Sequence, residues 1–179
     1  MLEDGSVTTP KIANNAVTPA KMAQPLTQAT ALATTSGTAI DFTGIPSWVR
    51  RITVALRGVS TSGTSDYCIR LGTSGGFVST GYVGSAGTSA SFSLNGGSGM
   101  ILFGATAPIA STVAHAIITI VNISGNAWVY SSQLAFSDAA GMRNAGGSVD
   151  IGGTLTQLRL TTIGGTDTFD AGSINIIYE

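Results

Sequence analysis

The sequence predicts an all-β protein, an antiparallel, jelly-roll-like β-sandwich that follows an extended N-terminal stem. From residue 29 onward, apolar residues alternate with polar ones or form short runs rich in Val, Ile, Thr and aromatic side chains. Clusters of Gly and Ser separate these runs at the spacing typical of sandwiches. No segment shows the periodicity of an amphipathic helix. Without crossover helices, two antiparallel sheets packed face to face are the expected architecture.

Ten strands are expected in this part of the chain. The clearest signal lies at 51–57, where Ile52, Val54 and Leu56 alternate with polar or small residues. This alternation predicts one core face and one face turned to solvent or to a neighbouring subunit. The expected strands cover residues 38–42, 49–59, 67–71, 77–83, 89–94, 100–103, 113–123, 127–136, 155–162 and 173–178.

Glycine-rich segments between the strands predict the loops. Four of them are expected at 72–76, 84–87, 95–99 and 139–147, because tight turns need residues that accept a positive φ. Loops carry binding residues more often than the faces of a sheet do. We therefore expect receptor contacts at or beside these loops, and the candidate residues are Tyr82, Asn95, Arg143 and Asn144.

The N-terminal stem, residues 1–28, contains a ten-residue repeat. The segment VTTPKIA at 7–13 returns as VTPAKMA at 17–23, so that Val7, Lys11 and Ile12 correspond to Val17, Lys21 and Met22. Prolines at 10, 19 and 25 exclude a continuous helix. So short a repeat buries almost nothing alone and gains order only against other copies or other chains. The stem is therefore interpreted as a docking and oligomerisation segment, and residues 29–179 as the head domain.

Composition excludes several classes of partner. Charged residues make up 9% of the 179 residues, against about 25% in an average domain. The net charge is −1 and no basic stripe is present, which argues against nucleic-acid binding. Apolar runs are too short to span a bilayer, and no secretion leader is expected after the acidic start at Glu3 and Asp4. A single cysteine, Cys68, rules out an intrachain disulfide.

Catalytic and cofactor motifs are not found. The only histidine, His115, lies inside an expected strand, which favours a packed position over a Ser-His-Asp site. One histidine and one cysteine cannot complete a zinc site, and no phosphate-binding loop is present. No cofactor is expected.

Carboxylates are scattered, except for Asp167 and Asp170. These two precede the last expected strand, where turn bonding is favoured over a calcium site because the alternating pattern of calcium loops is missing. No pair is spaced for glycosidase chemistry. Among the aromatic residues, Trp128 is assigned to the core, and Trp48 is expected to cover one end of the sandwich.

Three segments together resemble known virion proteins. The stem repeat, the segment IPSWVRRITV at 45–54 and the ending GTDTFDAGSINIIYE at 165–179 are similar to the stems and C-terminal heads of tail-fibre proteins of tailed bacteriophages. The resemblance implies a homotrimer whose stem attaches to the baseplate or tail and whose head faces the host surface. It also implies a virion location, with synthesis in the cytoplasm of the bacterial host. Its motifs are structural and transfer no active site.

The expected function is thus a virion fibre protein that contacts host cell-surface polysaccharide through several weak sites. One alternative is a capsid-attached head fibre or decoration protein, which would use the same stem on a different docking surface. A second alternative is a tailspike enzyme that degrades polysaccharide. The lack of a spaced carboxylate pair argues against the enzyme.

Overall fold

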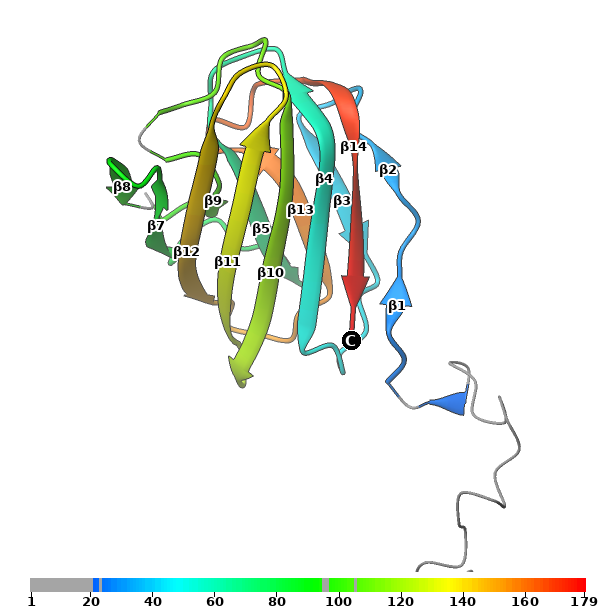
Figure 1. Cartoon of the computed structure of the whole chain (residues 1–179). Coiled ribbons are helices and arrows are strands. Elements are labelled where there is room, and N and C mark those ends of the chain that lie inside the picture. Colours follow the sequence, from blue (N-terminus) through cyan, green and yellow to red (C-terminus); the bar gives the residue numbers. More distant parts are fainter. Residues whose placement is uncertain (1–20, 23, 95–96, 105) are drawn as a thin grey trace, which may run out of the picture.

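The described part of the chain is a two-layer antiparallel β-sandwich. The computed structural model describes residues 21–22, 24–94, 97–104 and 106–179 (Figure 1). In spatial order, the nine-stranded sheet contains β1 (Thr27–Gln28), β14 (Phe169–Tyr178), β4 (Arg51–Thr61), β10 (Ala114–Ser124), β11 (Ala127–Phe136), β12 (Met142–Asp150), β7 (Val83–Gly87) and β8 (Phe92–Leu94), with β2 (Leu32–Ala33) also paired to β14. The five-stranded sheet contains β3 (Ala39–Thr43), β13 (Gln157–Thr162), β5 (Tyr67–Thr73) and β6 (Gly76–Phe77), with β9 (Met100–Ile101) paired to β5. The predicted all-β sandwich is confirmed.

The core lies between the two sheets and follows the alternation of the long strands. Ile52 and Val54 of β4 are fully buried, as are Ile118 and Ile120 of β10. Leu158 and Leu160 of β13 come from the opposite sheet and belong to the same cluster. The predicted inward face of 51–57 is confirmed. Trp128 is 3% exposed, which confirms its assignment to the core.

The two ends of the sandwich differ in what they carry. The chain enters the sandwich at β1, at the end where β14 finishes (Figure 1). Two antiparallel pairings explain this, since Thr27 faces Tyr178 and the backbone N–H groups of Arg50 and Arg51 donate to the carbonyl of Glu179. We call this the near end. The opposite far end carries the connections at 62–66, 102–113, 137–141 and 163–168, of which residue 105 is not described.

β-Bulges interrupt the pairing of the nine-stranded sheet near the far end. The register of β14 with β4 shifts twice between Phe169 and Ser173, and that of β10 with β4 shifts between Ala114 and Ala116. Gly58 and Gly172 face each other at this position with φ values of 63° and 95°. A Cβ on Gly172 would collide with the carbonyl of Gly58. Glycine is therefore required where the two strands approach each other.

Three sequence predictions in the middle of the chain are wrong. The expected strand at 77–83 is regular only at its two ends, in β6 and β7. The expected loop at 84–87 is strand β7, and most of the expected loop at 139–147 is strand β12. Three glycines of β7 and β12, Gly84, Gly87 and Gly147, serve close backbone packing rather than turns. A Cβ on Gly147, for example, would meet the carbonyl of Val83 in the paired strand.

Tyr82 is buried, which corrects its assignment as a receptor contact. Its side chain is 1% exposed, and its hydroxyl accepts a hydrogen bond from Leu71 N at 2.9 Å and donates one to Val78 O at 3.2 Å. Burial raises the pKa of this phenol to about 12. Tyr82 thus holds the segment between β6 and β7 against β5, and its buried side chain is not accessible to a ligand.

We expect Tyr82→Phe to lower the free energy of unfolding by about 1–3 kcal/mol, because the N–H of Leu71 would lose its acceptor in a buried position. Urea denaturation followed by circular dichroism measures the change. Tyr178→Phe is the control, since it removes the same hydroxyl from a half-buried side chain at the near end. Equal stability of the two variants would contradict the assigned role of Tyr82.

Truncation tests where the head domain begins. The strand pairing of the head starts at β1, and the segment after it is held by Ala29 N donating to Ile176 O and Thr34 Oγ1 donating to Ala171 O. We expect a chain lacking residues 1–24 to melt at the same temperature as the full chain. A chain lacking residues 1–33 loses β1 and β2, exposes the edge of β14 and should melt roughly 5–10 °C lower in a calorimetric scan. Identical melting of both truncations would place the boundary of the head after residue 33.

Candidate functional site

A cavity of about 220 Å³ opens at the far end of the sandwich. It lies where the start of β12 and the end of β11 meet the connection from β9 to β10. The walls combine aromatic and aliphatic groups with two charged side chains: Phe103, Thr106, Ala107, Pro108, Ile109, Thr112, Phe136, Asp138, Ala139, Ala140 and Arg143. Arg143 is one of the residues proposed from sequence.

Arg143 projects from the inward-facing side of β12, the same side as the buried Ala145 and Val149. Its guanidinium lies over the ring of Phe136, with Cζ 5.0 Å from the ring centroid. Nη1 donates to the carbonyl of Met142 at 3.0 Å, and the buried Nε has no acceptor within the part of the chain that the structure describes. A half-buried arginine that contacts a ring and donates to a backbone carbonyl has restricted freedom, and its remaining donors are available to a ligand.

The aromatic wall of the cavity continues into the core. Phe136 stacks on Phe103 with centroids 5.5 Å apart and planes at 26°. Phe103 meets the edge of Tyr67 at 4.8 Å, and Tyr67 in turn meets Phe169 at 6.2 Å. Tyr67, Phe103 and Phe169 are buried to 1% exposure or less. The wall that backs Arg143 is therefore anchored in the packed interior.

Two carboxylates organise the loops around the cavity. Asp138 Oδ1 accepts from Val113 N at 2.8 Å, and Asp66 Oδ2 accepts from Gly104 N at 3.1 Å. Burial raises the pKa of Asp66 from 3.8 to about 6, while the bond from Gly104 and the charge of Arg143 act in the opposite direction. Asp66 lines a neighbouring cavity of about 310 Å³ with Ser98 and Gly104. Asp66 and Asp138 thus line two adjoining cavities, which share Ala107.

His115 is hydrogen-bonded to Ser137, a partner that the sequence analysis did not find. Nε2 lies 3.2 Å from Ser137 Oγ, and Nδ1 accepts from Gly58 N at 3.3 Å. Because an N–H points at Nδ1, the neutral ring carries its proton on Nε2 and donates to the serine. This is the reverse of the polarity that a general base needs. His115 thus accepts the hydrogen bond of the bulged residue Gly58. The histidine side chain is half-buried on the outward side of β10.

The remaining predicted residues are dispersed. Asn144 is exposed on the outward side of β12, whereas Asn95 lies outside the described residues. Asp167 Oδ2 accepts from Ser65 N at 2.8 Å, while Asp170 is exposed. Among the described residues, no group of three or more His, Cys, Asp or Glu side chains could hold a metal ion. Of the stem residues, Lys21 and the 43%-exposed Met22 are described, and Val7, Lys11, Ile12 and Val17 lie outside the described range.

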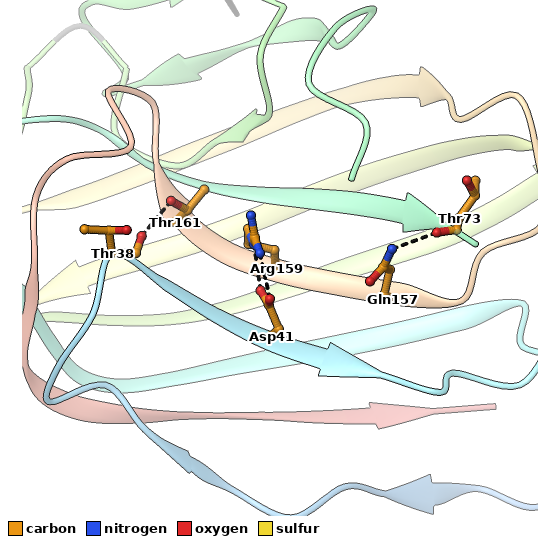
Figure 2. Close-up of polar contacts among 6 residues, drawn as sticks. All are labelled: Thr38, Asp41, Thr73, Gln157, Arg159 and Thr161. Atoms are coloured by element: carbon orange, nitrogen blue, oxygen red, sulfur yellow. Dashed lines mark hydrogen bonds and ion pairs between the residues drawn. The ribbon is translucent and has the colours of Figure 1, made fainter. Parts of the chain in front are cut away.

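A second polar cluster lies on the outward side of the five-stranded sheet (Figure 2). Arg159 donates through Nε and Nη2 to the two carboxylate oxygens of Asp41, each at 2.7 Å, and its Cζ lies 4.0 Å from the ring centroid of Phe77. Gln157 Nε2 donates to Thr73 O, and Thr161 Oγ1 donates to Thr38 O. These bonds tie β3 and β5 to the central β13. The cluster therefore serves the sheet itself.

Comparison with protein-family models, with curated proteins and with solved structures found no match to this chain. No helix within the described ranges is long and apolar enough to cross a membrane. The functional interpretation consequently rests on the geometry of the far end and on the sequence of the stem.

The raised pKa of Asp66 predicts how stability depends on pH. Below pH 4 the carboxyl is protonated in both the folded and the unfolded chain. Between pH 4 and 6 the unfolded chain ionises first, so stability falls as pH rises, and the loss is complete above pH 6. We expect Asp66→Asn, measured by urea denaturation from pH 3.5 to 8, to remove this part of the decline.

Asp150→Asn is the matched control for the loss of one negative charge, since Asp150 is exposed at the near end. The expected profile of this control runs parallel to that of the unsubstituted chain between pH 4 and 6. An Asp66→Asn profile that also ran parallel would contradict the burial of the Asp66 carboxyl as the cause.

Proposed function

We propose that this chain is a structural fibre subunit of a tailed bacteriophage virion, a homotrimer attached to the baseplate or tail by its N-terminal stem. In this proposal the head contacts host cell-surface polysaccharide through the far-end cavity around Arg143, without cleaving it. The observation that carries the proposal is the polarity of the sandwich. The chain enters beside its own C-terminal strand, so the end opposite the point of attachment is left to carry the cavity.

The lining of this cavity suits a sugar unit. A sugar ring combines an apolar face with hydroxyl groups, and pockets that bind such ligands join apolar walls to a few fixed polar groups. Phe136 and Pro108 provide apolar surface, Arg143 provides donors, and Asp138 provides an acceptor. With one positive and one negative group in the lining, the cavity favours a polyhydroxylated ligand over a strongly charged one.

A single shallow contact of this kind binds weakly. Three copies held by one stem convert the second and third contacts into intramolecular events, which raises the overall avidity without any new interaction. Attachment through several weak sites is what the stem repeat and the small cavity support together. The capsid-attached head fibre stays an alternative, because the far end would be presented in the same way from a different docking surface.

The test is binding of the purified full-length protein to an array of bacterial surface polysaccharides. We expect Arg143→Ala to weaken binding roughly tenfold per site, about 1.4 kcal/mol, because one charge-assisted donor is lost. Arg50→Ala is the matched control. Arg50 lies at the near end, and its Nη1 also donates to nearby carbonyls, those of Ser47 and Val49. Binding reduced equally by both substitutions, or by neither, would contradict the assignment.

The same array separates binding from cleavage. We expect no release of reducing ends during incubation with the protein. Release that disappeared in Asp66→Asn or Asp138→Asn would establish the polysaccharide-degrading alternative, with a site assembled in a way that one copy of the chain does not reveal.

A further inference from the structure

The outward face of the nine-stranded sheet carries almost no charge. Outward-pointing residues of five adjacent strands form three cross-strand rows, which the register places side by side. One row runs through Asn144, Gln133, Ile117, Ala55 and Asn175. The next runs through Gly146, Ser131, Thr119, Thr53 and Ile177, and the third contains Ser148, Val129 and Val121. We call these three rows the outer face.

Charges occur only at the margin of the outer face. Arg51 is paired with Glu179 at the near end, Asp150 closes β12, and Arg57 lies next to the bulge at Gly58. Large apolar side chains are exposed within it, including Ile117 at 54%, Val121 at 40% and Val129 at 37%. An outward sheet face without a single charge in its centre is unusual for a surface that stays in water, because charged residues are depleted mainly at the cores of interfaces.

We infer that the outer face is the interface between copies of this chain. The whole outward side of these five strands, about ten residues long at the usual spacing, presents roughly 800 Å², which is what each partner contributes to a stable interface of standard size. The three rows of the outer face form its uncharged centre, roughly 500 Å². The face also suits a copy of itself better than a charged partner. Hydroxyl and carboxamide groups both donate and accept, so in a trimer one side of the face on one copy packs against the other side of the face on the next copy without repulsion between like charges.

The shape of the outer face also suits contact with another copy of the chain. Two hollows of about 340 and 390 Å³ share Ile117 and Gln133 in their linings. Met142 and Ala135 line one, and Ser131 and Asn144 line the other. Hollows beside a protruding isoleucine allow side chains of a neighbouring copy to interdigitate. In addition, β1 and β2 lie at the edge of this same sheet, so the N-terminal segments of associated copies start alongside the interface.

The inference rests on the proposed homotrimer and is tested in the full-length chain by light scattering. We expect the unsubstituted protein to have three times the 18.0 kDa chain mass. Ile117→Lys should raise the dissociation constant of the assembly roughly 100-fold, because a charge would be buried without a partner. Leu94→Lys is the control, since Leu94 is 86% exposed on β8, away from the outer face. Circular dichroism and the urea midpoint verify that each variant is folded, and Gln133→Glu replaces Ile117→Lys if the latter fails to fold.

Cysteine labelling tests the face even if the stem alone holds the copies together. Cys68 is fully buried, so the unsubstituted protein gives little background with a maleimide. Ser131→Cys should react at least tenfold more slowly than Leu94→Cys in the assembled protein. Equal labelling rates in an assembled protein overturn the interface and leave the homotrimer standing. A mass of one chain at 100 µM overturns the homotrimer and the interface together, whereas slow labelling of Ser131→Cys with a mass of three chains supports both.

Discussion

The position of the last strand fixes the polarity of the whole molecule. β14 pairs with β4 on one side and with β1 and β2 on the other, so the first and last strands of the head lie together. This antiparallel pairing brings the entering chain and Glu179 to the same end and leaves the connections around the Arg143 cavity at the other. The separation of the Arg143 cavity from the point where the chain enters depends on this pairing. Had the last strand run in the opposite direction, the Arg143 cavity would lie beside the point where the chain enters.

Strand alternation divides the nine-stranded sheet into two chemically different faces. The inward residues Ile52, Ile118 and Tyr130 pack against the second sheet, whereas the outward residues are mainly hydroxyls, amides and isolated aliphatic groups. The charged residues of this part of the molecule lie at the ends of the sandwich. Asp66, Asp138 and Arg143 all lie at the far end, where they hold the loops or line a cavity. The outward side of the nine-stranded sheet therefore has an uncharged centre, whereas that of the five-stranded sheet carries the pair of Arg159 and Asp41.

Sequence patterns predicted the fold where alternation was regular and failed where glycine interrupted it. β11 has the bounds expected from sequence, and β4 and β10 differ by one or two residues at each end. β12 was missed because Gly146 and Gly147 resemble turn residues, although Gly147 permits close packing against β7. Tyr82 was misplaced for a related reason, since its glycine neighbours suggested an exposed loop. Its burial depends on contacts with Leu71 and Val78 that no local pattern encodes.

The candidate site was only partly predictable for the same physical reason. Arg143 was identified because it stands in a glycine-rich segment, but its partner Phe136 lies across the β11–β12 hairpin, and Phe103, which stacks on Phe136, comes from the connection before β10. Only the antiparallel pairing of β11 with β12 and the packing of Phe103 beneath them bring these residues together. The contact between His115 and Ser137 likewise forms across the register of β10 and β11. Pairings of this kind are set by the fold as a whole, so a single sequence does not reveal them.

The two proposed surfaces constrain each other through symmetry. Copies whose N-terminal segments share one attachment point must run parallel, so their symmetry axis lies along the strands rather than across them. Association through the outer face about such an axis places all far ends on one side, and the Arg143 cavities then face the same target. A two-fold axis perpendicular to the strands would bury the same face but would point the cavities in opposite directions. Parallel assembly is therefore the arrangement in which a weak single contact gains from multivalency.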